Sequence, residues 1–435
     1  MDFIEDFLHE VRKHRSKYIY SFLLLFLSFY LIYTRFEFLF VEGNFNYLNL
    51  YGTLIFVFLI IRYFVSVGYN PTIWKRKSSY KPKVDIVVPA FNEGEAVYGT
   101  VESIIKSNYP TRKINIYVVN DGSTDDTALY ARKAVRDFNQ YKNIHFIDLK
   151  NNVGKREAMA VAIRKSKSKY ILFVDSDSFI DKNCVSEMIK PFLVDKEVGA
   201  VTGKAEVRNY DKNYLTRMQA VSYHNTFGTI KSLESMMGFI TCCSGCCAAY
   251  RRSLIMENLE TWLNQEIFGV KCIYGDDRAL TNLVLKSGHK CVYNSKAIAE
   301  TIVPDKYKQF FKQQLRWRRS WLNETRVLLS YLHKKNVFSS IFIFFEWVIT
   351  PLITPFATII FLAYLFLVLS PVAIAVYLLF VVLLATCFGI YFKLGNQDKK
   401  NWLIAALLST LINVSLFWQL PYALVTFRQN SWGTR

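Results

Sequence analysis

The stretch that decides the fold is Tyr170-Ile-Leu-Phe-Val174, which runs directly into Asp175-Ser176-Asp177-Ser178. A short unbroken apolar run predicts a strand covered on both faces, because half-exposed strands alternate with polar residues. In open α/β sheets, ligands bind beyond the carboxyl ends of strands, where an Asp-x-Asp pair can hold a hard cation that holds a diphosphate. Taken alone, a solvated acidic turn explains the pair equally well.

Outward from this strand, β-branched runs alternate with helical patterns from about residue 81 to residue 201. This alternation predicts an α/β fold with a mostly parallel sheet and helices on both faces. Asn92 is expected to cap the first helix. The expected elements, in chain order, are strand 84–88, helix 96–105, strand 114–119, helix 125–137, strand 144–147, a helix from 154, strand 170–174, helix 185–193 and strand 199–201.

Polar residues follow the expected strands, at the edge of the sheet where a ligand would bind. They are Ala90-Phe-Asn-Glu93, Asp121-Gly122, Lys155, and Asp175 with Asp177. Each alone is an ordinary loop residue, but their shared edge favours a nucleotide-sugar pocket. The loops carry no G-x-G-x-x-G after the first strand and too few glycines for a P-loop, which disfavours a dinucleotide or ATP site.

The segment 204–301 is less regular and contains Gly275-Asp276-Asp277-Arg278 ahead of an apolar helix at 280–285. A carboxylate after a glycine turn is either a general base or an acid stabilised by the helix dipole. Taken alone, the second role is the simpler explanation.

The segment 306–335 mixes aromatic and basic residues, which suits helices lying in the plane of lipid headgroups. It includes Gln313-Gln-Leu-Arg316-Trp317. An arginine here can offset diphosphate charge and a tryptophan can stack on a sugar ring, or both can be interfacial anchors.

Apolar residues crowd at both ends of the chain, in the blocks 18–33 and 48–67 and almost continuously after residue 337. Blocks approaching this length predict membrane-spanning helices, and no cleavage site follows the first block to make it a signal peptide. Basic residues precede the first block, whereas the loop at 42–49 has none. This asymmetry predicts a cytosolic N-terminus and a cytosolic central segment.

The formal charge of +19 falls mainly on those cytosolic segments, and we expect it to attract anionic headgroups and nucleotide diphosphates rather than nucleic acid. The chain has eight cysteines, four of them in Cys242-Cys243-Ser-Gly-Cys246-Cys247. One C-x-x-C pair is a weak zinc signal without a second pair, so buried thiols in a reducing compartment are favoured.

Together, these motifs resemble those of the processive inverting glycosyltransferases of family two, which include synthases of hyaluronan, chitin and cellulose. The resemblance runs from about residue 84 to residue 317 and rests on Pro89-Ala-Phe-Asn-Glu93, Asp121-Gly-Ser123, Asp175-Ser-Asp177, Asp276-Asp277 and Gln313-x-x-Arg316-Trp317. It implies a GT-A-like cytosolic domain that uses UDP-sugars and Mg²⁺ or Mn²⁺.

Within the family, Trp262-x-Asn264-Gln265, the run from Gly275 to Asn282 and the closing Trp432-Gly-Thr-Arg435 look most like hyaluronan synthases. The cysteine-rich stretch 242–252, with Val303-Pro-Asp305, instead resembles chitin and chitooligosaccharide synthases, and Ala279 stands where hyaluronan synthases usually carry histidine. The implied product is hyaluronan, made from UDP-GlcUA and UDP-GlcNAc. A chitin-type polymer made from UDP-GlcNAc alone is the alternative.

The resemblance also implies roles for single residues. Asp277 would be the base that deprotonates the acceptor hydroxyl, Asp177 would ligate the metal ion, and Ser244 and Trp317 would contact the acceptor sugar. The residues implied to contact the nucleotide sugar are Ala90, Glu93, Asp121, Lys155, Asp175, Gln313, Arg316, Trp432 and Arg435.

The expected organisation is that of a multi-pass protein of the plasma membrane, whose helices pass the growing polysaccharide outward. In order, it comprises an N-terminal arm with two transmembrane helices (1–70), a cytosolic glycosyltransferase domain (71–303), amphipathic interface helices (304–336), C-terminal transmembrane helices (337–427) and a tail motif (428–435). Three C-terminal spans would leave the tail outside, whereas a tail that gates UDP must be inside, so the number of spans stays open.

Overall fold

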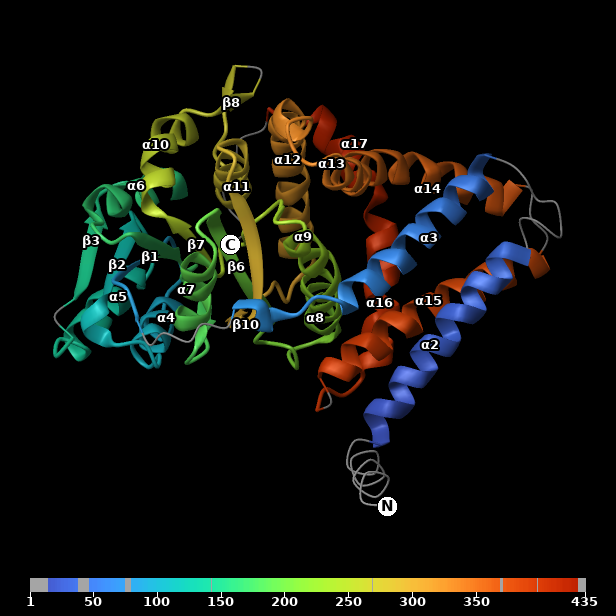
Figure 1. The fold of residues 1–435 in the computed structure, drawn as a ribbon, viewed down its shortest axis with the longest axis horizontal. Coiled ribbons are helices and arrows are strands. Elements are labelled where there is room, and N and C mark those ends of the chain that lie inside the picture. The colour runs from blue at the N-terminus through green and yellow to red at the C-terminus, as the bar shows by residue number, and fades with distance from the viewer. Residues whose placement is uncertain are drawn as a thin grey trace. The chain divides into compact units, whose positions relative to one another are not determined.

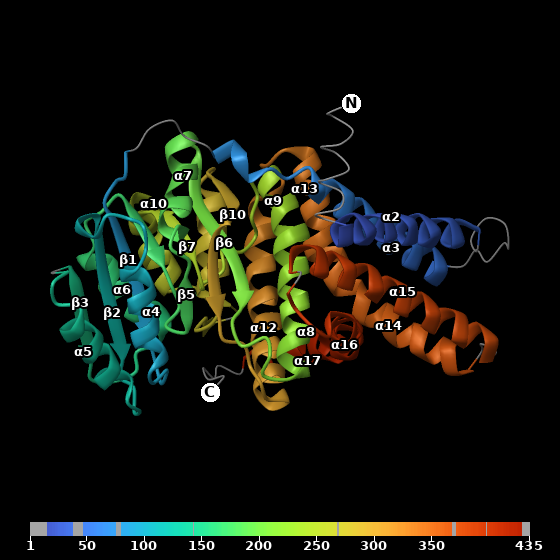
Figure 2. The ribbon, with the colours of Figure 1, turned by 90° about the horizontal axis from the view of Figure 1, so that it is seen from below.

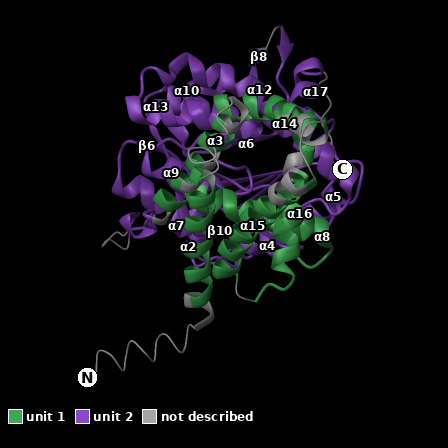
Figure 3. Cartoon of the chain, turned by 90° about the vertical axis from the view of Figure 1, so that its right-hand side faces the viewer, with its two compact units in different colours: residues 1–67, 210–229, 349–418 green, residues 68–209, 230–348, 419–435 purple. Residues whose placement is uncertain are grey.

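The structure is a computed structural model that describes residues 15–37, 47–74, 80–141, 143–267, 269–367, 371–396 and 398–428. It divides into two compact units (Figure 3). Unit 1 comprises Met1–Val67, Tyr210–Thr229 and Ile349–Trp418, and unit 2 comprises Gly68–Asn209, Ile230–Val348 and Gln419–Arg435. Each unit therefore joins segments that are far apart in the sequence.

Unit 2 is built on an eight-stranded sheet with the strand order β3-β2-β1-β4-β7-β6-β10-β5 (Figure 1). Its parallel half consists of β1 (Val84–Ala90), β2 (Ile114–Asp121), β3 (Ile144–Leu149) and β4 (Tyr170–Phe173). The mixed half consists of β7 (Ala248–Arg251), antiparallel to β4 and to β6 (Val198–Val207), and β10 (Lys290–Thr301), parallel to β6 and antiparallel to β5 (Ser178–Ile180). All four residues of β4 are buried, as its unbroken apolar run predicts.

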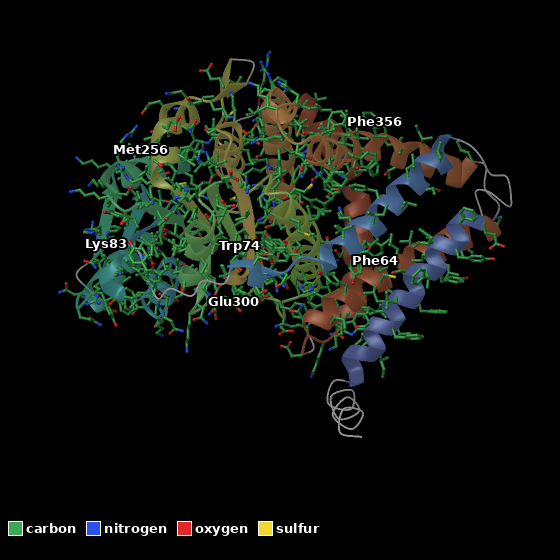
Figure 4. The ribbon with its side chains drawn as sticks, in the orientation of Figure 1. Phe64, Trp74, Lys83, Met256, Glu300 and Phe356 are labelled. Carbon is green, nitrogen blue, oxygen red and sulfur yellow. The ribbon has the colours of Figure 1, made fainter. Side chains whose placement is uncertain are left out.

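Helices cover both faces of the sheet (Figures 1 and 2). On one face, α4 (Ala96–Ile105), α5 (Thr127–Asp137) and α7 (Cys184–Val194) share a single apolar core with the strands. Trp74, labelled in Figure 4, belongs to this core, and its indole nitrogen donates to the Tyr293 carbonyl at 3.4 Å. The other face carries α6 (Lys155–Lys165), α10 (Arg252–Leu263) and α11 (Asp276–Lys286).

Three details differ from the sequence-based expectations. Asn92 does not cap α4, because it adopts a φ of 54° and its side chain accepts from the Thr124 amide at 2.9 Å, which closes a loop instead. The segment 204–301 contains β7 and the long strand β10, whose polar residues and register shift after Tyr293 hide the strand pattern. The amphipathic segment forms one continuous helix, α12 (Tyr307–Leu332).

Unit 1 is helical, with α2 (Arg15–Phe36), α3 (Tyr47–Val67), α8 (Tyr214–Asn225), α14 (Thr350–Leu367), α15 (Pro371–Gly395) and α16 (Trp402–Ser415). Leu24 and Leu31 of α2 pack against Cys387 and Ile390 of α15. Across the described residues, three stretches are long and apolar enough to cross a membrane: Val337–Ile360, Leu378–Gly395 and Trp402–Val425. These helices mark a membrane protein, while the crossing of α2 and α3 stays a prediction.

Asp85 fixes the start of β4 relative to β1 and β2. Its fully buried carboxylate accepts from the Asn115 amide at 2.6 Å, from the Ser168 hydroxyl at 2.6 Å, and from the backbone N–H groups of Lys167 and Ser168 at 2.7 and 2.8 Å. Since residues 167 and 168 lead directly into β4, this carboxylate sets the register of the strand that ends at Asp175.

We expect Asp85→Ala to destabilise unit 2, because it leaves several buried donors unsatisfied at a cost of about 3 kcal/mol. For a domain of this size, that cost lowers the midpoint of thermal unfolding by roughly 6–12 °C. The control is Asp137→Ala, which removes an exposed ion pair with Arg136 and should shift the midpoint little. Equal midpoints for the two variants would contradict the structural role of Asp85.

Candidate active site

The turn that presents Asp175 and Asp177 follows β4 at the edge where β1 and β2 also end. It is held from both flanks, since the Thr100 hydroxyl of α4 donates to the Ser176 carbonyl at 2.8 Å and the Asp175 amide donates to the Gly245 carbonyl at 3.2 Å. The two carboxylates are therefore presented from a fixed turn rather than from a mobile loop.

Lys155 joins the two acidic motifs of the sequence. Its ammonium lies 2.7 Å from Oδ1 of Asp175 and 3.2 Å from Oδ2 of Asp276. Burial opposes the charge of Lys155, but Asp175 and Asp276 outweigh it and raise the pKa of the ammonium above its usual value. Lys155 is therefore a permanent cation between the end of β4 and the start of α11.

Asp121, the last residue of β2, shapes the loop that leads to Lys155. Its two carboxylate oxygens accept from the Val153 amide at 2.8 Å and the Gly154 amide at 3.0 Å. Burial raises the pKa of Asp121, and these two hydrogen bonds oppose that rise. Gly154 adopts a φ of 91°, which allows α6 to begin directly at Lys155.

The acids of α11 occupy different environments. Asp276 is 7% exposed and pairs with Lys155. Burial would raise its pKa, but Lys155 and Arg156 lower it below the usual value. Asp277 has no ion-pair partner among the described residues, and accepts from the Arg278 amide at 2.7 Å and from the Cys242 thiol at 3.4 Å. Of the two, Asp277 is better placed to accept a proton.

A small pocket lies between these groups. It is lined by Pro89, Lys155, Met159, Phe173, Asp175, Cys243, Gly245, Ala248, Tyr250, Asp276, Asp277 and Leu280. Gly245 faces Asp175 so closely that an added Cβ would lie 3.0 Å from its Oδ2 atom. Asp175, Lys155 and the two acids of α11 thus line one pocket.

Helix α12 carries Gln313, Arg316 and Trp317 and packs against the start of α11. Gly275, at a φ of 73°, leaves room for Ser320, whose Oγ atom would lie 2.1 Å from an added Cβ. Gln313 and Arg316 are half-buried and Trp317 is 38% exposed. These three side chains are not among the described residues that line the pocket, whereas Ser320 of the same helix lies against Gly275.

The remaining predicted residues are not among those that line the pocket, and two of them lie outside the described residues. Ala90 ends β1 and is buried, and the Glu93 amide donates to the Thr127 hydroxyl at 2.8 Å. The Ser244 amide donates to the Thr202 hydroxyl at 3.2 Å. Trp432 and Arg435 lie outside the described residues.

The segment just before the tail does reach the loop of Asp277. Thr426 accepts from Arg319 of α12 at 2.8 Å, and the Phe427 carbonyl accepts from the Tyr274 hydroxyl at 3.0 Å. Tyr274 immediately precedes the Gly275 turn, so this segment ends beside the acids of α11.

Sequence reasoning missed the contact between Cys242 and Asp277. Burial raises the pKa of the Cys242 thiol, so it stays protonated and donates to the carboxylate. The sequence signal was the cysteine-rich stretch itself, which predicted buried thiols. All eight cysteines are buried, and the described residues contain no group of three or more His, Cys, Asp or Glu side chains able to hold a metal ion.

Arg278 was also missed as a candidate for anion binding. Its Nε and Nη1 atoms are buried without a hydrogen-bond partner among the described residues. Its guanidinium lies 5.1 Å from the ring centroid of Trp347, whose indole nitrogen donates to buried Glu234 at 2.7 Å. A fixed tryptophan thus supports one side of an arginine with unused donors.

Comparison with known proteins agrees with this geometry. The family model described as glycosyltransferase like family 2 matches residues 82–320. The chain belongs to glycosyltransferase family 2. It is therefore a glycosyltransferase, and its mixed sheet with flanking helices is the GT-A-like fold expected from the motifs.

Three similar proteins extend the comparison. The chain is 32% identical over 393 residues to a hyaluronan synthase of Streptococcus pyogenes serotype M1, covering 89% of this chain and 90% of that protein. It is 37% identical over 258 residues to an N-acetylglucosaminyltransferase of Neorhizobium galegae, covering 59% of each. A mannosyltransferase of Pyrobaculum calidifontis, solved with GDP-Man and Mn²⁺, shares the fold at a TM-score of 0.53 and 17% identity, covering 82% of this chain and 99% of that one.

If UDP is the nucleotide, as the sequence motifs predict, Lys155→Met should weaken its binding at least tenfold, because the substitution removes the cation between Asp175 and Asp276 and would leave two acids facing the diphosphate. Isothermal titration of the purified protein with UDP measures this change. The control is Lys165→Met, an exposed position at the far end of α6. Unchanged UDP affinity in Lys155→Met would show that the diphosphate binds elsewhere.

Proposed function

We propose that this glycosyltransferase is a processive inverting hyaluronan synthase, which polymerises UDP-GlcUA and UDP-GlcNAc and exports the chain through its own membrane helices. One observation carries the chemistry: the same pocket is lined by Lys155, a cation suited to a diphosphate, by Asp175, an acid suited to a cation that binds the diphosphate, and by Asp277, a carboxylate suited to accept a proton. A transferase must hold the donor and the acceptor together in one site so that they meet in a reactive geometry.

The donor diphosphate binds at the carboxyl edge of the sheet, with Lys155 and Asp121 shaping its site. Three carboxylates line the pocket, those of Asp175, Asp276 and Asp277, and Lys155 is the cation paired with the first two. Asp177 follows Asp175 by two residues on the same turn. A diphosphate adds further negative charge. The site therefore calls for additional cations. Arg316 of α12 is proposed as one of them from the family motif, although its side chain does not line the pocket.

The carboxylates fit Mg²⁺ or Mn²⁺, because Mg²⁺ is typically bound through one or two carboxylates with substrate phosphates and water. Asp177 would hold the ion, with Asp175 beside it. When bound, the ion stabilises the negative charge that develops on the departing diphosphate.

Asp277 acts as the base. The acceptor hydroxyl attacks the anomeric carbon of the donor while its proton passes to Asp277, and the bond from that carbon to the β-phosphate oxygen breaks with its electron pair on UDP. The single in-line displacement turns an α-linked donor into a β-linked product. Trp317 and Ser244 hold the acceptor sugar, and Arg316 and Gln313 contact the donor side.

Two observations support hyaluronan as the product. The similarity to the streptococcal synthase extends over nearly the whole chain. Arg278 directly follows the proposed base and has two buried donors without a partner among the described residues, and a guanidinium is the group that best matches a carboxylate. We also assign the tail motif at Trp432 and Arg435, which lies outside the described residues, to the nucleotide site.

A chitin-type synthase is the second candidate. It is favoured by the 37% identity to the N-acetylglucosaminyltransferase and by the cysteine-rich loop at 242–247. The deciding experiment incubates purified protein with UDP-GlcUA alone, UDP-GlcNAc alone and both, and then digests the product with hyaluronidase or chitinase. Hyaluronidase-sensitive polymer formed only with both donors is the expected result. Chitinase-sensitive polymer from UDP-GlcNAc alone would establish the second candidate.

Asp277→Asn should abolish sugar transfer, by at least a thousandfold, while UDP affinity stays within threefold of the wild type. The amide keeps the shape of the side chain but cannot take the proton. Polymer yield and UDP titration measure the two properties. Loss of UDP binding along with transfer would show that Asp277 supports the fold or the donor instead.

Asp177→Ala should remove the metal-dependent activity, because the diphosphate loses the ligand that holds its cation. The measurement compares polymer synthesis at increasing Mn²⁺ or Mg²⁺ with synthesis in the presence of a chelator. Full activity of this variant in chelator would overturn the metal assignment. Asp181→Ala, three residues past the acidic turn, is the matched control and should behave as the wild type.

A further inference from the structure

A buried hydrogen-bond chain connects α12 with α11. Glu324 of α12 is 2% exposed, and one of its carboxylate oxygens accepts from the Asn282 amide of α11 at 2.7 Å. The same Asn282 nitrogen lies 3.1 Å from the Glu324 backbone carbonyl, and the Tyr331 hydroxyl donates to the Asn282 carbonyl oxygen at 2.7 Å. The helix that bears Arg316 and Trp317 is thereby fixed along the helix that begins with Asp276 and Asp277.

Through Gln265, the hydrogen-bond chain continues to Arg156, the residue that follows Lys155. The Gln265 amide nitrogen donates to the other oxygen of Glu324 at 2.6 Å, and its carbonyl oxygen accepts from the Arg156 guanidinium at 3.0 Å. Because the amide is held as donor on one side and acceptor on the other, it has one orientation. Gln265 thus joins a buried cation to a buried anion that do not touch.

Arg156 anchors the other end of the chain. Its guanidinium donates to the Trp262 carbonyl at 2.8 Å and the Tyr274 carbonyl at 3.1 Å, and the Trp262 indole donates to the Asp276 carbonyl at 3.0 Å. These bonds hold the turn on which Asp277 stands. Arg156 also directly follows Lys155 in the sequence, so a shift of one residue moves the other.

The motif residues Gln265 and Asn282 belong to this chain, although neither lines the pocket. Breaking the chain at any one member leaves a buried charged or polar group without its partner, which is costly and is relieved by movement of α12 or of the Gly275 turn. A movement of about 1 Å at a reacting centre is enough to lower a rate by two orders of magnitude.

We propose that Gln265, Asn282 and Glu324 are positioning residues that set the distance between Lys155 at the donor and Asp277 at the acceptor. The same three residues also fix the position of α12 relative to both. This inference rests on the proposed role of Asp277 as the base. The three side chains act through Arg156 and the Gly275 turn and do not contact the reacting atoms.

The test compares Gln265→Leu and Glu324→Leu with Glu257→Gln, an exposed position on α10. We expect both leucine variants to bind UDP within threefold of the wild type and to lose at least 30-fold in kcat, with Glu257→Gln unchanged. The kcat of the double variant should be no lower than that of the less active single variant, because both substitutions break the same hydrogen-bond chain. Near-normal kcat in the leucine variants, or a double variant whose loss is the product of the two single losses, would contradict the proposal.

Glu324→Gln covers the case in which a leucine variant fails to fold. It keeps the volume and the bond from Gln265 but presents a donor to Asn282, so we expect an intermediate loss of about five- to tenfold in kcat without loss of UDP binding. A kcat equal to that of the wild type, or loss of UDP binding, would overturn the positioning role. The wild type is assayed with both UDP-sugars throughout: an inactive wild type contradicts the proposed function, whereas an active wild type with equally active variants contradicts only the positioning chain.

Discussion

The ion pairs of Lys155 with Asp175 and Asp276 are the interaction on which the site depends. They connect the end of β4 in the parallel half of the sheet to the start of α11, which covers the mixed half. Without a cation there, the acids of the two motifs would repel one another in a partly buried pocket, and burial of an uncompensated carboxylate is strongly unfavourable. One lysine therefore allows the donor and acceptor chemistries to share a single pocket.

This arrangement divides the work of two adjacent acids. The charge of Asp276 is compensated by Lys155, which lowers the pKa of Asp276 and keeps it ionised. Asp276 is therefore a poor proton acceptor at the moment of transfer. Asp277, one residue further along the helix, forms no ion pair among the described residues and accepts from the Cys242 thiol. The buried hydrogen-bond chain from Arg156 to Glu324 then keeps α11 and α12 at a fixed distance from Lys155. Local charge thus sets the roles, and a buried polar network sets the distances.

Much of this could be predicted from the sequence, because parallel strands end at a common edge. The run 170–174, the β-branched strands before it and the acids after them carried that information. The antiparallel strand β7 escaped prediction because it has only four residues, and the long strand β10 escaped because its polar and irregular sequence lacks a period of two. The contacts of Lys155 with Asp276 and of Cys242 with Asp277 join residues that only the fold brings together, and no local pattern indicates them.

The most direct measurement is an experimental structure of the Asp277→Asn variant with an intact UDP-sugar and Mg²⁺. We expect the diphosphate beside Lys155, the metal ion at Asp177, and the anomeric carbon facing position 277 across the pocket. A diphosphate bound away from Lys155, or a sugar ring directed away from position 277, would contradict the assignment of this pocket as the place of transfer.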